Sequence, residues 1–123
     1  MLSGIIEQSR YPKLILPFVM HGKPMDLKFL VDTGFDSEVA LSYGHADRFD
    51  LEILQYAKVT YASGKSEQEI IARGKIVWFG EERDVRVILS DDEEPAIGTR
   101  LLKDCVMTMD FRNDTLTIDK PMP

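Results

Sequence analysis

The chain has 123 residues, of which 44% are apolar and 29% are charged, and its formal net charge is -6. This balance is typical of a soluble globular protein, and the length suits a single domain over residues 1–123. The acidic charge argues against a nucleic-acid partner, and the single Cys105 excludes both a disulfide scaffold and a zinc finger.

Two features of the sequence bear on location in the cell. A single cysteine fits a reducing compartment. The apolar stretch at residues 14–20 is short and is interrupted by Pro17, so we expect neither a signal peptide nor a membrane span. These features predict a cytoplasmic protein without a membrane partner.

Short apolar or alternating runs, separated by Gly, Pro and Asp, dominate the chain and predict an all-β fold. The runs at residues 14–20 and 25–31 flank residues 21–24, whose sequence HGKP has the chemistry of a turn. This pattern predicts a hairpin. Its second strand leads directly into Asp32.

After the first hairpin, the sequence predicts one strand and one short helix. Residues 38–42 form the expected strand, and the polar residues 43–50 form the expected helix, with Ser42 as its N-cap. His21 in the preceding turn and His45 in the helix lack the paired spacing of a zinc site. We expect both histidines to be solvated.

A second hairpin is predicted in the middle of the chain. The runs at residues 56–61 and 67–72 surround residues 62–66, which are small and polar. Gly64 in this segment can take the positive φ that a hairpin tip needs. We therefore expect a hairpin that projects from the body of the protein.

The last third of the chain predicts four more strands and a helical turn. The expected strands are residues 75–79, 85–89, 106–111 and 115–119, and the first two are joined by residues 80–84. Residues 99–104 resemble a helical turn. Cys105, which follows, is interpreted as a small core residue rather than a nucleophile.

Asp32, Thr33 and Gly34 place an acid, a hydroxyl and a residue without a side chain at the end of an apolar strand. Peptide hydrolysis without a metal or a nucleophilic side chain requires a general base for water and a general acid for the carbonyl. Two carboxylates that share one proton supply both roles, as they do in aspartic proteases. The sequence has one such loop, so a two-fold homodimer would bring two copies of Asp32 together. Alternatively, the loop is an ordinary turn in which Asp accepts backbone N–H groups.

Two further segments extend this pattern along the chain. Residues 61–64, of sequence YASG, lie at the predicted hairpin tip, and residues 96–98, of sequence AIG, precede Leu101 and Leu102. Over residues 13–119 the order of these segments resembles the retropepsin-like aspartic peptidases. The resemblance implies an all-β, closed acid-protease barrel with a flap hairpin and one or two short helices.

The resemblance also implies roles for individual residues and for partners. Asp32 would be catalytic, Thr33 and Gly34 would support the catalytic loop, Tyr61, Ser63 and Gly64 would form the flap over substrate, and Ile97 and Gly98 would pack behind the loop. Tyr61 has an equally good interpretation as a strand residue facing the core. The implied partners are a second copy of the chain and an extended peptide substrate, with no metal and no cofactor.

Two residues depart from the pattern of the family. Phe35 stands where the family usually has Ala or Ser, and a large ring there would narrow the cleft or reshape a substrate pocket. Asp36 and Arg100 are expected to pair, although Arg100 lies one position later than the family pattern places it. An exposed, unpaired Arg100 is the alternative.

The sequence leaves three functions open. The first is a homodimeric aspartic endopeptidase whose interface uses residues 2–6 and 115–119, paired as strands across the axis. The second is a dimer of the same fold that binds peptides without useful catalysis, which Phe35 favours. The third is an unrelated β-barrel in which Asp32-Thr33-Gly34 is incidental.

Overall fold

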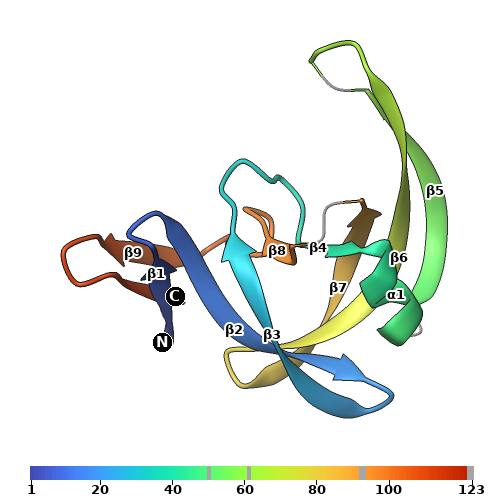
Figure 1. Cartoon of the computed structure of the whole chain (residues 1–123). Helices are drawn as coiled ribbons and strands as arrows, with labels where there is room; N and C mark the ends of the chain where they lie inside the picture. The colour runs from blue at the N-terminus through green and yellow to red at the C-terminus, as the bar shows by residue number, and fades with distance from the viewer. Residues whose placement is uncertain (50, 61, 92–93, 122–123) are drawn as a thin grey trace.

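The computed structural model describes residues 1–49, 51–60, 62–91 and 94–121. Within these residues the chain forms ten strands and one helix (Figure 1). In chain order they are β1 Leu2–Glu7, β2 Tyr11–Met20, β3 Lys23–Val31, β4 Val39–Ser42, α1 Tyr43–Phe49, β5 Glu52–Thr60, β6 Ser66–Trp78, β7 Glu81–Ser90, β8 Ala96–Ile97, β9 Val106–Asp110 and β10 Thr115–Asp119.

The strands belong to one sheet in the order β5-β6-β7-β4-β8-β3-β2-β1-β10-β9. An additional pairing of β2 with β6, at Phe18 and Ile76, joins β6, β7, β4, β8, β3 and β2 into a ring. Phe18 and Ile76 are fully buried, and Phe29 and Leu41 belong to the same core. The all-β class predicted from the sequence is confirmed.

The β2–β3 hairpin delivers the chain to Asp32. His21 and Gly22 connect the two strands with φ values of 50° and 76°, as a two-residue type I′ turn requires. The strands then pair over eight residue pairs. The predicted hairpin is confirmed, although its turn is shorter and its strands are longer than expected. His21 is exposed at the turn, as predicted.

Helix α1 begins after Ser42, whose Oγ accepts a hydrogen bond from the His45 backbone N–H at 3.2 Å. The predicted N-cap is therefore confirmed. Phe49, 3% exposed, anchors the helix in the core. The last residue of the predicted helix, Asp50, lies outside the described residues. Among those described, no helix has the length or the apolar character needed to cross a bilayer.

Strand β6 continues where the sequence predicts a break between two strands, at Arg73 and Gly74. A Cβ atom on Gly74 would lie 2.6 Å from Phe18 Cζ and 3.0 Å from Val87 Cγ2. Glycine is therefore present because β2 and β7 approach closely here. The two strands predicted on either side of Arg73 and Gly74 are parts of one continuous strand.

The turn between β6 and β7 is also tighter than predicted. Phe79 and Gly80 have φ values of 52° and 80° and connect the strands as a two-residue turn. Strand β7 therefore begins at Glu81, inside the segment that was expected to be a loop. The strand predicted at residues 85–89 is part of β7, and the strand predicted at residues 75–79 is part of β6 except for Phe79, which lies in the turn.

The predicted helical turn at residues 99–104 is a short series of hydrogen-bonded turns. The Gly98 carbonyl accepts hydrogen bonds from the Leu101 and Leu102 backbone N–H groups at 3.2 and 3.3 Å. Asp104, with φ of 63°, stops any extension into a helix. Strands β9 and β10 then form the hairpin predicted at the end of the chain.

Strands β1 and β10 pair with each other inside one chain, with Leu2 opposite Ile118 and Ile5 opposite Thr115. The other edge of β10 pairs with β9, and β1 also pairs with β2. The pairing of residues 2–6 with 115–119 that was expected across a dimer axis is therefore formed within one chain, and the use of these segments at a dimer interface stays a prediction. The outer strands of the described sheet are β5 and β9.

Candidate active site

Asp32 is fixed at the end of a buried strand. Val31, the last residue of β3, pairs with Ile97 of β8 in parallel, and the two side chains are 4% and 0% exposed. The Asp32 backbone N–H donates to the Ile97 carbonyl at 2.9 Å. The backbone at Asp32 is therefore held by the core on one side and by β8 on the other.

The side chain of Asp32 is held by its own loop. Its Oδ1 atom accepts a hydrogen bond from the Gly34 backbone N–H at 2.9 Å, and its carbonyl accepts one from the Phe35 N–H at 3.1 Å. Asp32 is half-buried, whereas Thr33 and Gly34 are exposed. The first of these hydrogen bonds is the one expected of an ordinary Asp turn. It also fixes the orientation of the Asp32 carboxylate.

Gly98 lies directly behind the loop. A Cβ atom at this position would lie 2.4 Å from the carbonyl oxygens of both Phe35 and Ser37, so no larger residue fits without movement. The Gly98 and Thr99 N–H groups donate to the Glu38 and Phe35 carbonyls at 3.0 and 2.8 Å. The Ala96-Ile97-Gly98 segment is therefore the back wall of the Asp32 loop.

Phe35 is half-buried and its ring lies against this wall. Its Cδ2 atom is 2.6 Å from the place that a Cβ on Gly98 would occupy. One edge of the ring packs on the backbone of Gly98, and this contact gives a second reason for glycine there. The expectation that the ring narrows the cleft or reshapes a substrate pocket stays a prediction.

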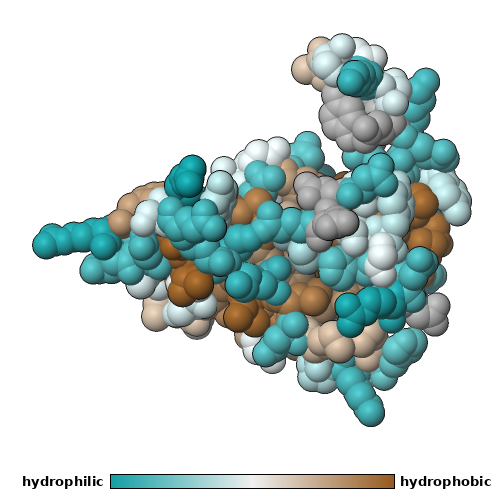
Figure 2. Space-filling view, viewed as in Figure 1, coloured by the Kyte–Doolittle hydropathy of each residue, from teal (hydrophilic) through white to brown (hydrophobic). Residues whose placement is uncertain are grey.

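The β5–β6 hairpin stands over the side of the molecule that carries the loop after β3 (Figure 1). Its strands pair as far as Thr60 and Ser66, whose hydroxyls are 3.0 Å apart. Ser63 and Gly64 are exposed at the tip, where Gly64 has φ of 85°. Figure 2 shows this tip projecting away from the rest of the surface. Tyr61, the remaining flap residue suggested by the sequence, lies outside the described residues.

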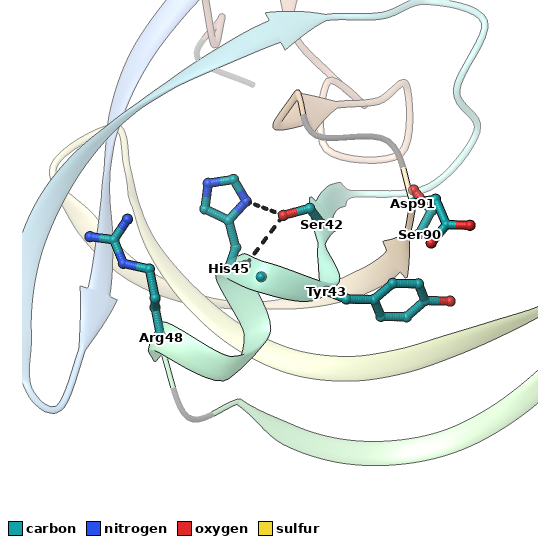
Figure 3. A pocket seen from close by; sticks show the side chains of 7 residues that line it. Ser42, Tyr43, His45, Arg48, Ser90 and Asp91 are labelled. Atoms are coloured by element: carbon teal, nitrogen blue, oxygen red, sulfur yellow. Dashed lines mark hydrogen bonds between the residues drawn. The ribbon is translucent and has the colours of Figure 1, made fainter.

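A separate cavity of about 460 Å³ lies beside α1, lined by Ser42, Tyr43, Gly44, His45, Arg48, Ser90 and Asp91. The Ser42 Oγ atom is 2.7 Å from His45 Nδ1 (Figure 3). In this view Asp91 lies on the far side of Ser42 from the imidazole, so the three residues do not form a catalytic triad. Burial, and to a lesser degree the charge of Arg48, lowers the pKa of His45.

His45 is thus half-buried and bonded to the helix cap, and the expectation that it would be solvated is wrong. The interval of three residues between Ser42 and His45 was the available signal in the sequence, because it places both side chains on the first helical turn. We interpret the pair as part of the cap of α1.

Cys105 is not activated as a nucleophile, and the described acidic side chains form no metal site. Burial is the main cause that raises the pKa of the half-buried Cys105 thiol, so the nucleophilic thiolate is disfavoured. Cys105 packs at the edge of the core, as predicted. Among the described residues, no group of three His, Cys, Asp or Glu side chains is placed to bind a metal ion.

Asp36 and Arg100 come together but form no ion pair in the described part of the chain. They line one cavity of about 200 Å³ with Ser37, Arg86 and Ile88. The Arg100 backbone N–H donates to the Ser37 carbonyl at 3.3 Å. The pairing expected from the sequence is thus replaced by a shared cavity beside the Asp32 loop.

Solved structures resemble this arrangement. The EIAV protease complexed with the inhibitor HBY-793 is similar with a TM-score of 0.63 and 20% sequence identity, over 80% of this chain and 90% of that chain. The retroviral protease-like domain of Ddi1 from Leishmania major is similar with a TM-score of 0.51 and 20% identity, over 89% of this chain and 90% of that chain. No protein-family model and no curated protein sequence match the chain at a significant level. The likeness to these structures shows that the chain has the retropepsin-like fold.

Proposed function

We propose that the chain is one subunit of a homodimeric aspartic endopeptidase and that Asp32 is its catalytic residue. The observation that carries this proposal is the placement of Asp32. Its backbone is fixed by β3 and β8, its Oδ1 accepts the Gly34 N–H, and its neighbours Thr33 and Gly34 are exposed on the surface of the chain. The retropepsin-like fold supports the same reaction class by analogy.

In the proposed reaction, two Asp32 carboxylates from the two subunits share one proton. Like charges at hydrogen-bond distance cannot both ionise cheaply, so the pair titrates as a unit. The ionised carboxylate takes a proton from water as the water oxygen attacks the scissile carbonyl carbon, and the protonated carboxyl donates to the carbonyl oxygen. Collapse of the tetrahedral intermediate then breaks the C–N bond, and a proton passes to the leaving amine.

The loop and the flap would have supporting roles. Thr33 would bond across the dimer axis, Gly34 would let the substrate backbone approach, and Ile97 and Gly98 would hold the loop from behind. Ser63 and Gly64, with Tyr61, would close over an extended peptide and exclude water. The exposed, glycine-containing tip supports this assignment for the described flap residues.

The substitution Asp32→Asn tests the mechanism. Cleavage of a mixed peptide library at several acidic pH values should fall about a thousandfold or more, because the variant loses the group that binds and donates the proton. Asp26→Asn is the matched control, since Asp26 is an exposed acid on β3, the strand that leads into Asp32. Equal cleavage by wild type and Asp32→Asn would reject the proposal.

A second candidate function is a dimeric module that binds extended peptides without cleaving them. Phe35 favours it, because the half-buried ring replaces the small residue usual in retropepsin-like peptidases. Isothermal titration of the wild type with library peptides distinguishes the two functions. Peptides that bind and remain intact during long incubation would support the binding module.

A further inference from the structure

The cavity beside the Asp32 loop has a composition that the proposed peptidase reaction does not require. It measures about 200 Å³, which is enough for one side chain, and Arg86 and Arg100 are both in its lining. Asp36 is the acidic residue in the lining, so the lining carries two positive charges and one negative charge. The site therefore favours an anionic occupant with one charge.

The backbone of each arginine is fixed by a hydrogen bond, and both residues are exposed. The Arg86 N–H donates to Glu38 Oε1 at 2.9 Å, and the Arg100 N–H donates to the Ser37 carbonyl at 3.3 Å. Glu38 also accepts a hydrogen bond from Arg83 Nη2 at 2.9 Å, so its carboxylate is already occupied. Within the described residues, neither Arg86 nor Arg100 forms an ion pair.

The position of the cavity relates it to a bound peptide. Asp36 follows Asp32 by four residues, so the cavity begins at most about 14 Å along the chain from the catalytic carboxylate. An extended peptide advances about 3.3 Å per residue, so a residue no more than about four positions from the cleaved bond can reach the cavity. Ile88 provides an apolar contact for the stem of that residue, beside the buried Ser37, which is 7% exposed.

We propose that this cavity binds an acidic side chain, Glu or Asp, within about four residues of the cleaved bond, through Arg86 and Arg100. The proposal rests on the proposed function in so far as Asp32 marks the centre of the peptide-binding site. A planar guanidinium binds a carboxylate through two parallel hydrogen bonds, which gives geometric selectivity for a carboxylate over an amide of the same size. The charge of Asp36 disfavours a doubly charged phosphate group.

The experiment uses the full-length Asp32→Asn protein, which cannot cleave by the proposed mechanism, to select binders from a random octapeptide display library. Sequencing should show Glu and Asp enriched over Gln and Asn at one position by about five- to tenfold, as expected for a half-exposed charge-assisted hydrogen bond. Adding Arg86→Gln or Arg100→Gln should abolish this enrichment. The control Lys23→Gln, an exposed cation in the β2–β3 hairpin, should preserve it.

Measuring peptide cleavage by the wild-type protein distinguishes a failure of the cavity assignment from a failure of the proposed peptidase function. Cleaved peptides without an acidic preference would overturn the cavity assignment and leave the peptidase intact. Acidic enrichment without any cleavage would reject the peptidase and leave the cavity assignment intact. An enrichment that survives both arginine substitutions, or no captured peptide at all, would also overturn the assignment.

Discussion

Gly98 shows how strongly the Asp32 loop depends on a residue without a side chain. Substituting Gly98→Ala would bring the new methyl group against the Phe35 and Ser37 carbonyls, which are both backbone atoms of the loop. We expect the free energy of unfolding to fall by about 2–3 kcal/mol, the usual size of overpacking in a core. Urea unfolding monitored by circular dichroism measures this loss.

Gly44→Ala is the matched control for this substitution. Gly44 lies in α1, and its new methyl group would be 3.7 Å from Ser42 Oγ, an ordinary contact. Alanine should therefore stabilise the protein by up to about 1 kcal/mol through its higher helix propensity. If both alanine variants were equally stable, Gly98 would not be the tight back wall described above.

His45 gives the protein a predictable dependence on pH. Burial, with the charge of Arg48, lowers its pKa in the folded chain, so the folded state holds it neutral where the unfolded state binds a proton. The unfolded state then binds more protons below about pH 6.5, and stability falls as the pH drops through this window.

Thermal unfolding between pH 7.5 and 5.5 checks the dependence on pH. We expect His45→Gln to flatten the decline in melting temperature relative to wild type. The control His21→Asn, at an exposed turn position with positive φ, should retain the wild-type decline. Identical pH profiles for wild type and His45→Gln would show that His45 is not responsible.

At the scale of elements, Gly64 should be needed for movement of the β5–β6 hairpin tip and not for packing against neighbouring residues. A Cβ on Gly64 meets nothing within 4 Å, yet the φ of 85° disfavours any other residue. Gly64→Ala should cost about 1 kcal/mol of stability and lower kcat/KM by roughly three- to tenfold, because the tip loses conformations needed for closure.

Gly22→Ala separates the two effects of Gly64→Ala. Gly22, in the β2–β3 turn, has φ of 76° and is equally unobstructed, so it should lose the same stability. It lies at the opposite end of β3 from Asp32, and its kcat/KM should equal that of wild type. A parallel fall in kcat/KM for both variants would assign the loss to instability rather than to the flap.

An element could be predicted when the residues that determine it lie close together in the sequence. The β2–β3 turn, the Ser42 cap and the β9–β10 hairpin are encoded by residues within a few positions, and their predictions are confirmed. Gly74 was taken as a break because the atom that explains it, Phe18 Cζ, comes from a strand more than fifty residues away. The pairing of β1 with β10 is equally remote in sequence.

The candidate site likewise has features that neighbouring residues predict and features that only the fold reveals. The Asp32 turn was visible in three consecutive residues, and a glycine behind it was expected from the family pattern. The contact of the Phe35 ring with Gly98 and the cavity shared by Asp36 and Arg100 needed the fold, because each depends on how residues 96–100 pack against the loop. Long-range packing of this kind leaves no periodic signal in a single sequence.

At the scale of the whole molecule, one chain supplies one Asp32, and the proposed chemistry needs two. Because β10 pairs on both edges within its own chain, the proposed dimer would bury exposed side chains rather than a free edge of β10. Exposed apolar side chains at Ile5, Ile15 and Val106 are available for this contact. Light scattering should therefore show a mass that rises with concentration toward twice 14.0 kDa.

Subunit mixing tests whether the two carboxylates act together. When equal amounts of wild type and Asp32→Asn exchange subunits, about one quarter of the dimers carry two Asp32 residues, and about half carry one. If the pair is required, activity falls to about one quarter of that of wild type at the same total concentration. Subunits that act independently would retain about one half, so that value would contradict the shared site. The control is mixing of wild type with Asp26→Asn, which changes an exposed acid on β3. Activity should stay at the wild-type level, which would show that subunit exchange itself does not lower activity.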